Sequence, residues 1–80
     1  MRKREYNNGK RRKMKAIREG KAVSLRDLAG AIDVNYTTIS HWENGKRTPE
    51  RENVEKLEKF FKVSIEELMA EDEEYYGEVK

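Results

Sequence analysis

The sequence predicts an all-α domain built from five short helices, and three observations support this fold class. Apolar residues recur at spacings of three and four, as they do on the buried face of a helix. Ser, Asn and Gly stand where these stretches begin and end. No stretch shows the alternation of apolar and polar residues that is typical of a strand. With 80 residues, the chain has room for one domain with a small core.

The first helix is expected over residues 10–19, with Met14, Ile17 and Ala16 facing inward. These three side chains supply the apolar face that a short surface helix needs. Gly20 follows directly, in the place where a left-handed residue usually ends a helix.

The second helix is expected to begin after Ser24, whose hydroxyl can cap it, and to end near Ile32. Asp27 stands three residues after Ser24, in the position of a capping box. Leu28 and Ile32 lie four residues apart, so they share the inward face.

A short turn leads into the third helix, which is expected over residues 36–44. Asp33 tolerates a left-handed backbone better than most residues do, and Asn35 is a good N-cap. Gly45 is expected to end the helix.

Two more helices complete the expected fold. Pro49 suits the start of a fourth helix, and Ser64 with Glu67 forms a second capping box at the start of a fifth. The inward residues of both helices recur at spacings of three and four. They are Val54, Leu57 and Phe61 in the fourth helix, and Ile65 and Leu68 in the fifth.

The third helix divides into an apolar and a polar side. Ile39 and Trp42 lie three residues apart and face the core. The residues left over are polar: Asn35, Tyr36, Thr37, Ser40 and His41. A helix that presents amide, hydroxyl and imidazole groups on a basic protein is suited to reading base edges in a DNA groove.

The net charge of +2 conceals an uneven distribution along the chain. Residues 1–24 carry ten Lys or Arg and two acidic residues, whereas residues 62–80 carry two Lys and seven acidic residues. This asymmetry indicates a polyanionic partner on the N-terminal side. A solvated arm and a solvated tail have the same composition, so that alternative stays open.

Composition also excludes several classes of protein. The absence of cysteine excludes a disulfide framework and a thiolate metal site. No apolar run is long enough for a signal peptide or a membrane span, so we expect a cytoplasmic protein without membrane contact. His41 and Glu43 lie two apart on a helix and point in different directions, and no phosphate-binding glycine loop is present. We therefore expect neither an enzyme nor a bound cofactor or metal.

One stretch carries a more specific pattern. Residues 24–49 read S-L-x-x-L-A-x-x-I-D-V-N-x-x-x-I-x-x-W-E-N-G-x-x-x-P. The pattern resembles the helix-turn-helix domain of phage lambda repressor and Cro, the XRE family, over about residues 14–69. The resemblance implies a five-helix lambda repressor-like domain in which the second and third helices form the helix-turn-helix. It also implies a small transcriptional regulator of bacterial, phage or mobile-element origin, a repressor that binds double-stranded DNA in the nucleoid.

The resemblance assigns roles to the surface of the third helix. It implies base contacts from Tyr36, Thr37 and His41, and phosphate contacts from Asn35, Ser40, Asn44, Lys46 and Arg47. Leu25 departs from the family, which usually has a phosphate-binding Gln there, so Arg26 is expected to supply the charge. As an alternative role for Tyr36, its ring would lie flat against Ile32 or the turn.

The resemblance assigns structural roles as well. Ala29 stands where the second and third helices cross most closely, and a larger side chain there would force them apart. Ile39 and Trp42 are expected to pack into the core and so to hold the third helix in place. Arg18 and Glu43 match the positions of an ion pair that links the first helix to the third in this family.

Residues 11–69 are expected to hold the domain, between a flexible basic arm over residues 1–10 and a disordered acidic tail over residues 70–80. We expect the basic residues of this arm and of the first helix's start to follow the DNA backbone or to enter the minor groove. They are Arg2, Lys3, Arg4, Lys10, Arg11, Arg12 and Lys13. In the alternative, these residues only raise the nonspecific affinity for DNA. Because the chain ends too soon for a separate dimerisation domain, we expect a homodimer on DNA through the fifth helix and its flanks. The candidate contacts are Phe60, Met69, Tyr75 and Tyr76.

Two alternatives to a plain DNA-binding regulator remain open. The protein would be an antitoxin if the acidic residues 71–78 bound a basic toxin while the helices bound the operator of its own operon. It would be a helix-turn-helix scaffold for protein interactions if it no longer bound DNA, a reading supported only by Leu25.

Overall fold

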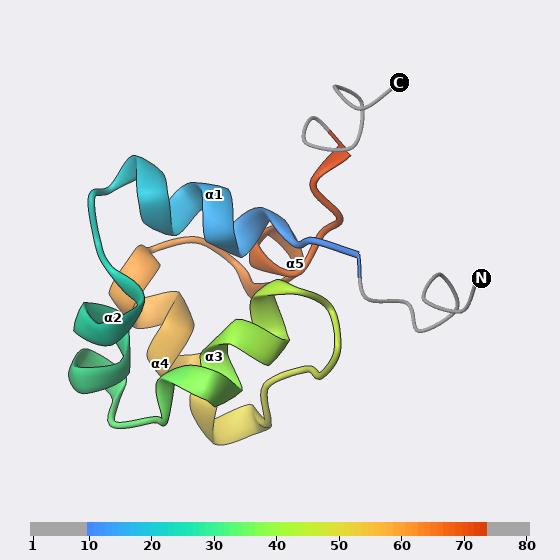
Figure 1. The fold of residues 1–80 in the computed structure, drawn as a ribbon. Helices are drawn as coiled ribbons and strands as arrows, with labels where there is room; N and C mark the ends of the chain where they lie inside the picture. The colour runs from blue at the N-terminus through green and yellow to red at the C-terminus, as the bar shows by residue number, and fades with distance from the viewer. Residues whose placement is uncertain (1–9, 74–80) are drawn as a thin grey trace.

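The computed structural model describes residues 10–73; the greater part of the expected arm and tail, with Tyr75 and Tyr76, lies outside the described residues. Five helices account for most of this range (Figure 1). They are α1 (Lys13–Gly20), α2 (Leu25–Ile32), α3 (Tyr36–Glu43), α4 (Arg51–Phe61) and α5 (Ile65–Leu68). The β structure in the described range is an isolated bridge between Arg12 and Glu71. The all-α fold class is therefore confirmed.

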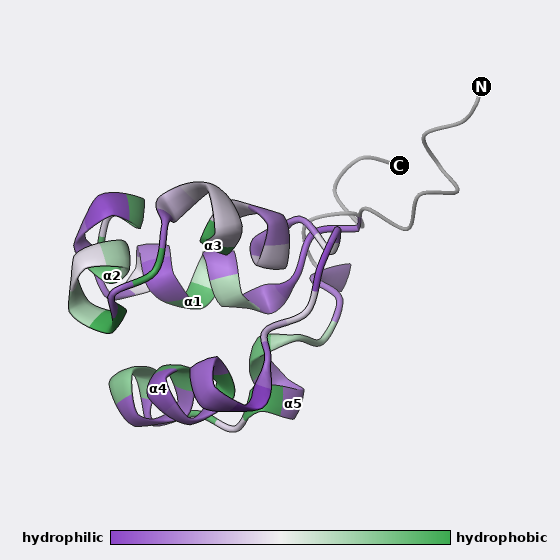
Figure 2. Cartoon of the chain, turned by 90° about the horizontal axis from the view of Figure 1, so that it is seen from below, coloured by the Kyte–Doolittle hydropathy of each residue, from purple (hydrophilic) through white to green (hydrophobic). Residues whose placement is uncertain are grey.

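One apolar core lies between the five helices. α2 packs against α3, α1 against α3 and α5, and α4 against α2 and α5. Figure 2 shows α3 along one edge of the molecule and α4 along the opposite edge. The core residues are Met14, Leu28, Ile32, Ile39, Trp42, Leu57, Phe61 and Leu68, and all eight belong to the inward-facing set that the spacing predicts.

Ala16 is exposed, so its expected inward orientation is wrong. It lies two residues after Met14, which places it on nearly the opposite side of α1. Ile17, Val54 and Ile65, which were also expected inward, are half-buried, and Ile17 and Ile65 pack against the core. Within residues 10–73, none of the helices is long and apolar enough to cross a membrane.

α1 begins three residues later than expected because residues 10–12 are not helical; Arg12 is extended and this segment is bonded to distant parts of the chain. The backbone N–H of Arg12 donates to the carbonyl of Glu43 at 2.7 Å, and that of Lys13 donates to the carbonyl of Ala70 at 2.8 Å. These tertiary hydrogen bonds replace the helical turn that local spacing favours.

The C-terminal end of α1 also differs from the expectation. Gly20 is the last helical residue, and the left-handed backbone occurs at Ala22, with φ 60°. The N–H of Val23 donates to the carbonyl of Arg18 at 3.2 Å, and that of Ala22 to the carbonyl of Glu19 at 3.0 Å. This pair of bonds is a Schellman motif, in which alanine occupies the position usually taken by glycine.

The ends of α2 and the start of α3 agree with the sequence prediction. Ser24 Oγ accepts the N–H of Asp27 at 2.9 Å, and Asp27 Oδ2 accepts the N–H of Ser24 at 3.3 Å, which completes the capping box. Asp33 is left-handed, with φ 59°. Asn35 Oδ1 accepts the N–H of Thr37 at 2.8 Å and so caps α3.

α5 begins with one half of the predicted capping box. Ser64 Oγ accepts the N–H of Glu67 at 3.2 Å. A carboxylate of α4 makes a further contact, because Glu58 Oε2 accepts the N–H of Ile65 at 2.7 Å. The start of α5 is thereby fixed against α4, three residues past the left-handed Lys62.

Residues 70–73 belong to the folded domain, which corrects the disordered tail expected from residue 70. The N–H of Asp72 donates to the carbonyl of Arg11 at 2.9 Å, and Asp72 is 6% exposed. Acidic composition alone predicts disorder, but here the basic residues 10–13 lie alongside and neutralise the segment.

Candidate nucleic-acid interface

The polar residues of α3 lie on the side of the helix that faces away from the core. Ile39 and Trp42 point inward and are nearly fully buried. The opposite side of α3 is formed by five residues at helical spacing, the last of which caps the helix. We call this surface the α3 face: Tyr36, Thr37, Ser40, His41 and Asn44. Three of its residues are exposed, and Ser40 and His41 are half-buried.

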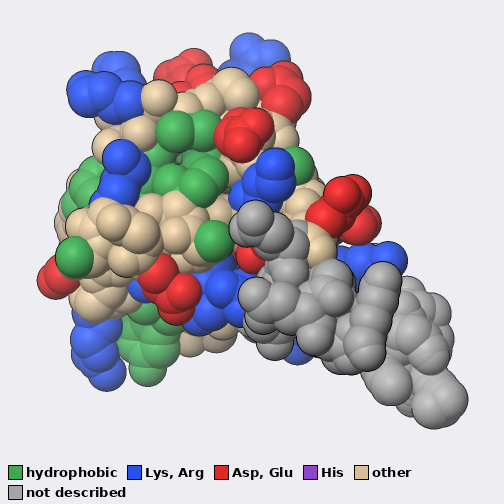
Figure 3. All heavy atoms as spheres, turned by 90° about the horizontal axis from the view of Figure 1, so that it is seen from above, with side chains coloured by type: hydrophobic (Ala, Val, Ile, Leu, Met, Phe, Trp, Pro, Cys, Tyr) green, Lys and Arg blue, Asp and Glu red, His purple; other side chains and the backbone are tan. Residues whose placement is uncertain are grey.

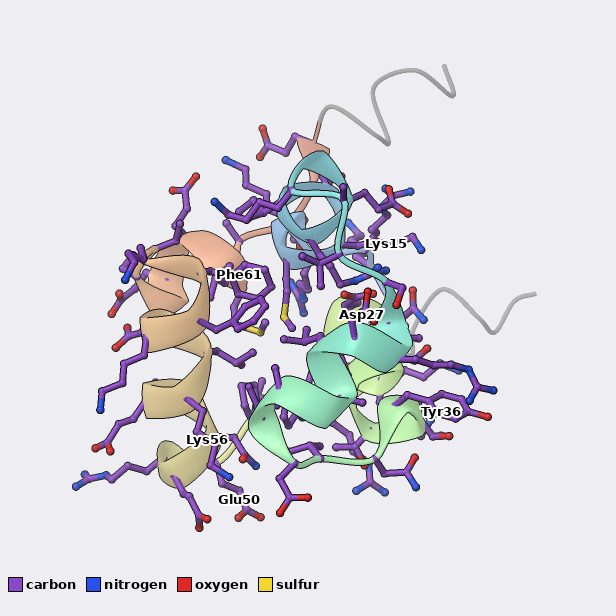
Figure 4. All side chains as sticks on the ribbon, turned by 90° about the vertical axis from the view of Figure 1, so that its left-hand side faces the viewer. Lys15, Asp27, Tyr36, Glu50, Lys56 and Phe61 are labelled. Atoms are coloured by element: carbon purple, nitrogen blue, oxygen red, sulfur yellow. The ribbon has the colours of Figure 1, made fainter. Side chains whose placement is uncertain are left out.

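Tyr36 stands out from this surface. Among the described residues it is the only large hydrophobic side chain that is exposed, at 44%. The guanidinium of Arg26, on α2, lies over its ring at 5.0 Å from the centroid. Figure 4 shows Tyr36 pointing outward on the side of the molecule away from Phe61. The arrangement favours an outward ring over the alternative in which it lies against Ile32.

A shallow hollow of about 460 Å³ lies beside Tyr36, between α2 and the turn into α3. Arg26 and Asn35 also line it, so the structure gathers three of the expected DNA-contacting residues around one depression. The oxygen of the Asn35 side chain is already bonded to the N–H of Thr37. A phosphate contact from Asn35 would therefore use its amide N–H groups.

The basic loop lies at the other end of the α3 face. The backbone N–H groups of Lys46 and Arg47 donate to the carbonyl of His41, at 2.9 and 3.3 Å. Asn44 Nδ2 donates to Ser40 Oγ at 3.4 Å. Both basic side chains are exposed. The loop therefore presents two positive charges just beyond the C-terminal end of α3.

A buried ion pair fixes α3 to α1. Arg18 Nε and Nη2 donate to the two carboxylate oxygens of Glu43, at 2.7 and 3.2 Å, and Arg18 Nη1 donates to the carbonyl of Val23 at 2.8 Å. Arg18 is 5% exposed and Glu43 2%. The hydrogen bonds to Glu43 raise the pKa of Arg18, against burial, which lowers it. This is the pair that the resemblance implies, and it orients α3 instead of facing DNA.

Two residues of α2 pack against the core beside α3. Ala29 is half-buried there, which agrees with its expected place at the helix crossing. Leu25 also packs against the core. Its side chain therefore has an apolar packing role at the start of α2, where the family usually has a phosphate-binding Gln. Within residues 10–73, no three His, Asp or Glu side chains are placed to hold a metal ion.

The fold and the α3 face define a small helix-turn-helix domain. A family model described as helix-turn-helix matches residues 14–68. The chain belongs to the helix-turn-helix family of the lambda repressor and Cro type, the XRE family. The family expected from the motif of residues 24–49 is thereby confirmed.

Three characterised proteins are similar in sequence. The HTH-type transcriptional activator BcrR of Enterococcus faecalis is 39% identical over 61 residues, which cover 76% of this chain and 30% of that protein. The cryptic phage CTXphi transcriptional repressor RstR of Vibrio cholerae is 34% identical over 61 residues, which cover 76% of this chain and 55% of that protein. The HTH-type transcriptional regulator DdrOP3 of Deinococcus deserti is 26% identical over 66 residues, which cover 82% of this chain and 50% of that protein.

The chain thus spans between 30% and 55% of the length of these relatives. No solved structure matches the chain significantly.

Proposed function

We propose that the chain is a transcriptional regulator that binds double-stranded DNA sequence-specifically, with α3 in the major groove. The observation that carries the proposal is the exposed α3 face, polar along its length and flanked by cations at both ends. Arg26 lies beside its start, and Lys46 and Arg47 follow its end. The similar proteins are named as an activator, a repressor and a regulator. From the resemblance to phage repressors, we propose repression.

In this proposal, three residues of the α3 face read bases. The hydroxyl of Thr37 donates or accepts, and its methyl group, like the ring of Tyr36, can touch a thymine methyl. His41 donates to N7 or O6 of guanine. The phosphate contacts come from Arg26, Asn35, Ser40, Asn44, Lys46 and Arg47.

The protein is further proposed to act as a homodimer, in the cytoplasm of a bacterium and at its nucleoid. Two copies would read half-sites about 34–36 Å apart, which gives a small domain adequate specificity. Phe60 and Met69 are half-buried, and part of each side chain remains accessible to a second copy. The ring of Phe60 packs edge-on against Phe61, with centroids 5.0 Å apart.

Selection of bound sites from random duplex DNA tests the proposal directly. We expect one enriched motif with two half-sites. The double variant K46Q/R47Q should bind all sequences more weakly. The slope of the logarithm of its binding constant against the logarithm of the salt concentration, the salt slope, should fall in magnitude by about two. The control K59Q/K62Q removes the same charge near the end of α4, opposite α3, and should bind like wild type. Recovery of random sequences would favour the scaffold alternative.

A further inference from the structure

Two short segments from opposite ends of the domain run side by side at the C-terminal end of α3 (Figure 1). Residues 10–13 are basic and residues 71–73 are acidic. Arg12 and Glu71 pair in an antiparallel bridge, and the backbone N–H of Asp72 donates to the carbonyl of Arg11 at 2.9 Å. The fold therefore brings together the opposite charges that the sequence keeps far apart, and Figure 3 shows Lys or Arg and Asp or Glu side chains intermixed on the face that it presents.

The ion pairs between these segments differ in the burial of their carboxylates. Arg11 Nε lies 3.5 Å from Asp72 Oδ2, and their side chains are 19% and 9% exposed. Arg12 is similarly covered, at 20%, but its partner Glu71 is 47% exposed and lies 3.9 Å from Arg12 Nη1 and 4.0 Å from Lys10 Nζ. Long ion pairs to an exposed carboxylate contribute little free energy, so another anion can replace Glu71. The pair with Asp72 holds the segments together, whereas the pairs with Glu71 are exchangeable.

Arg12 lies next to the basic loop that follows α3. A Cβ atom added to Gly45 would lie 3.0 Å from Arg12 Nε and 3.1 Å from Arg12 Nη2, so the guanidinium packs directly on this glycine. Gly45 has φ 75°, which lets the chain turn there without a side chain. Lys46 and Arg47 come next in the chain. Arg12 thus extends the positive charge of the loop.

The dimensions of α3 place this cluster near a DNA strand. A helix of eight residues is about 12 Å long, which is roughly the width of the major groove. When the first residues of α3 contact base edges, its C-terminal end lies near the phosphates that border the groove.

We propose that Arg12 is a further phosphate-contacting residue and that Glu71 is its intramolecular competitor, displaced when a DNA phosphate binds. The inference rests on the proposed DNA-binding function. It selects Arg12 from the basic residues expected to follow the DNA backbone and adds Glu71 as its competitor. Arg12 keeps its place without Glu71, because its backbone N–H is bonded to Glu43 at 2.7 Å. Glu71 therefore weakens DNA binding by this domain and lowers its dependence on salt.

The test uses the whole 80-residue chain and a mixed-sequence duplex of about 20 base pairs, two helical turns, with affinity measured over a range of salt concentrations. E71Q should tighten binding about two- to fivefold, as expected for release of an exposed pair. R12Q should weaken binding and reduce the salt slope by about one, and R12K should retain the slope. In the R12Q background, E71Q should lose most of its effect.

The matched control is E66Q, which removes the same charge from an exposed residue of α5. It should tighten binding less than E71Q does. Equal effects of E66Q and E71Q would overturn the proposal, because the gain would then reflect net charge alone. Failure of the wild-type chain to bind any duplex would instead contradict the proposed function. Thermal unfolding of each variant shows that binding is compared between folded proteins.

Discussion

The guanidinium of Arg26 lies 5.0 Å from the centre of the Tyr36 ring and so connects α2 with the first residue of α3. A stack at an exposed site contributes about 0.5–1 kcal/mol and restricts the rotamers of both side chains. In the proposed complex with DNA, the direction in which Tyr36 enters the groove therefore depends on Arg26. The guanidinium of Arg26 can also donate two parallel hydrogen bonds to a guanine base, whereas a phosphate contact requires only its positive charge.

Replacement of Arg26 by Lys separates charge from stacking. We expect Arg26→Lys to retain affinity for mixed-sequence DNA within about twofold, because the phosphate contact needs only the charge. Discrimination between the selected site and its single-base variants should fall, since a lysine does not hold the ring in the same way. Arg26→Ala should lose both properties. Discrimination by Arg26→Lys equal to that of wild type would show that the stack has no role in base reading.

Replacement of one partner of the Arg18 and Glu43 pair should strongly destabilise the domain. Glu43→Leu leaves a buried guanidinium without its carboxylate, and we expect the free energy of unfolding to fall by about 3–5 kcal/mol. The double variant Arg18→Met with Glu43→Leu should be more stable than either single variant. Urea unfolding followed by the fluorescence of Trp42 measures these differences. Additive single effects would contradict the coupling.

The pH dependence of this pair follows from the raised pKa of Arg18. A raised pKa in the folded state means that the stabilisation is fully present below the ordinary pKa of arginine, which is itself far above neutral. It is lost only as the pH rises through the higher, folded value. The ionisation of Arg18 should therefore leave the free energy of unfolding constant across neutral pH.

The core and most helix ends were predictable because they depend on local spacing. Leu28 and Ile32 face the same side of any helix that contains both. The capping box joins Ser24 to Asp27, only three positions later in the chain. The end of α1 was not predictable in the same way. Gly20 and Ala22 both stand near the last turn, and the contacts of Val23 decide which of them becomes left-handed.

The candidate site shows the same division between local and tertiary causes. The α3 face follows from helical periodicity, once Ile39 and Trp42 are placed in the core. The stack of Arg26 on Tyr36 depends on the angle between α2 and α3, which no spacing in the sequence contains. The position of Arg12 depends on a pairing with residues about sixty positions later in the chain.

An exchange of alanine and glycine at the end of α1 should stabilise the domain. Ala22 is left-handed and exposed, so Ala22→Gly should relieve strain of about 1 kcal/mol. Gly20 is helical and has open space around its Cα, so Gly20→Ala should add about 0.5–1 kcal/mol. Both single variants and the double variant are measured by thermal unfolding. A loss of stability in Ala22→Gly would mean that its backbone is not left-handed in solution.

Enlargement of Ala29 should move α3 relative to α2. Ala29 is half-buried against the core, and Ala29→Leu should cost about 1–3 kcal/mol through overpacking. Because the two helices form the proposed DNA-reading unit, the affinity for the selected site should fall as well. Ala31→Leu is the matched control, because Ala31 lies on the same helix and is exposed. It should leave unfolding and binding nearly unchanged.

Leu25→Gln tests whether the start of α2 approaches the DNA backbone as it does in the family. Leu25 packs against the core, so its replacement should lower the free energy of unfolding by about 1 kcal/mol through lost apolar burial. The new amide supplies one hydrogen-bond donor, which contributes about 0.5–1.5 kcal/mol, so affinity should rise for all sequences by about two- to tenfold. Leu25→Met keeps the apolar packing without a donor and should bind like wild type. Unchanged affinity in a folded Leu25→Gln variant would mean that the start of α2 lies away from the phosphates, and that the Lys46 loop and Arg12 carry the backbone contacts instead.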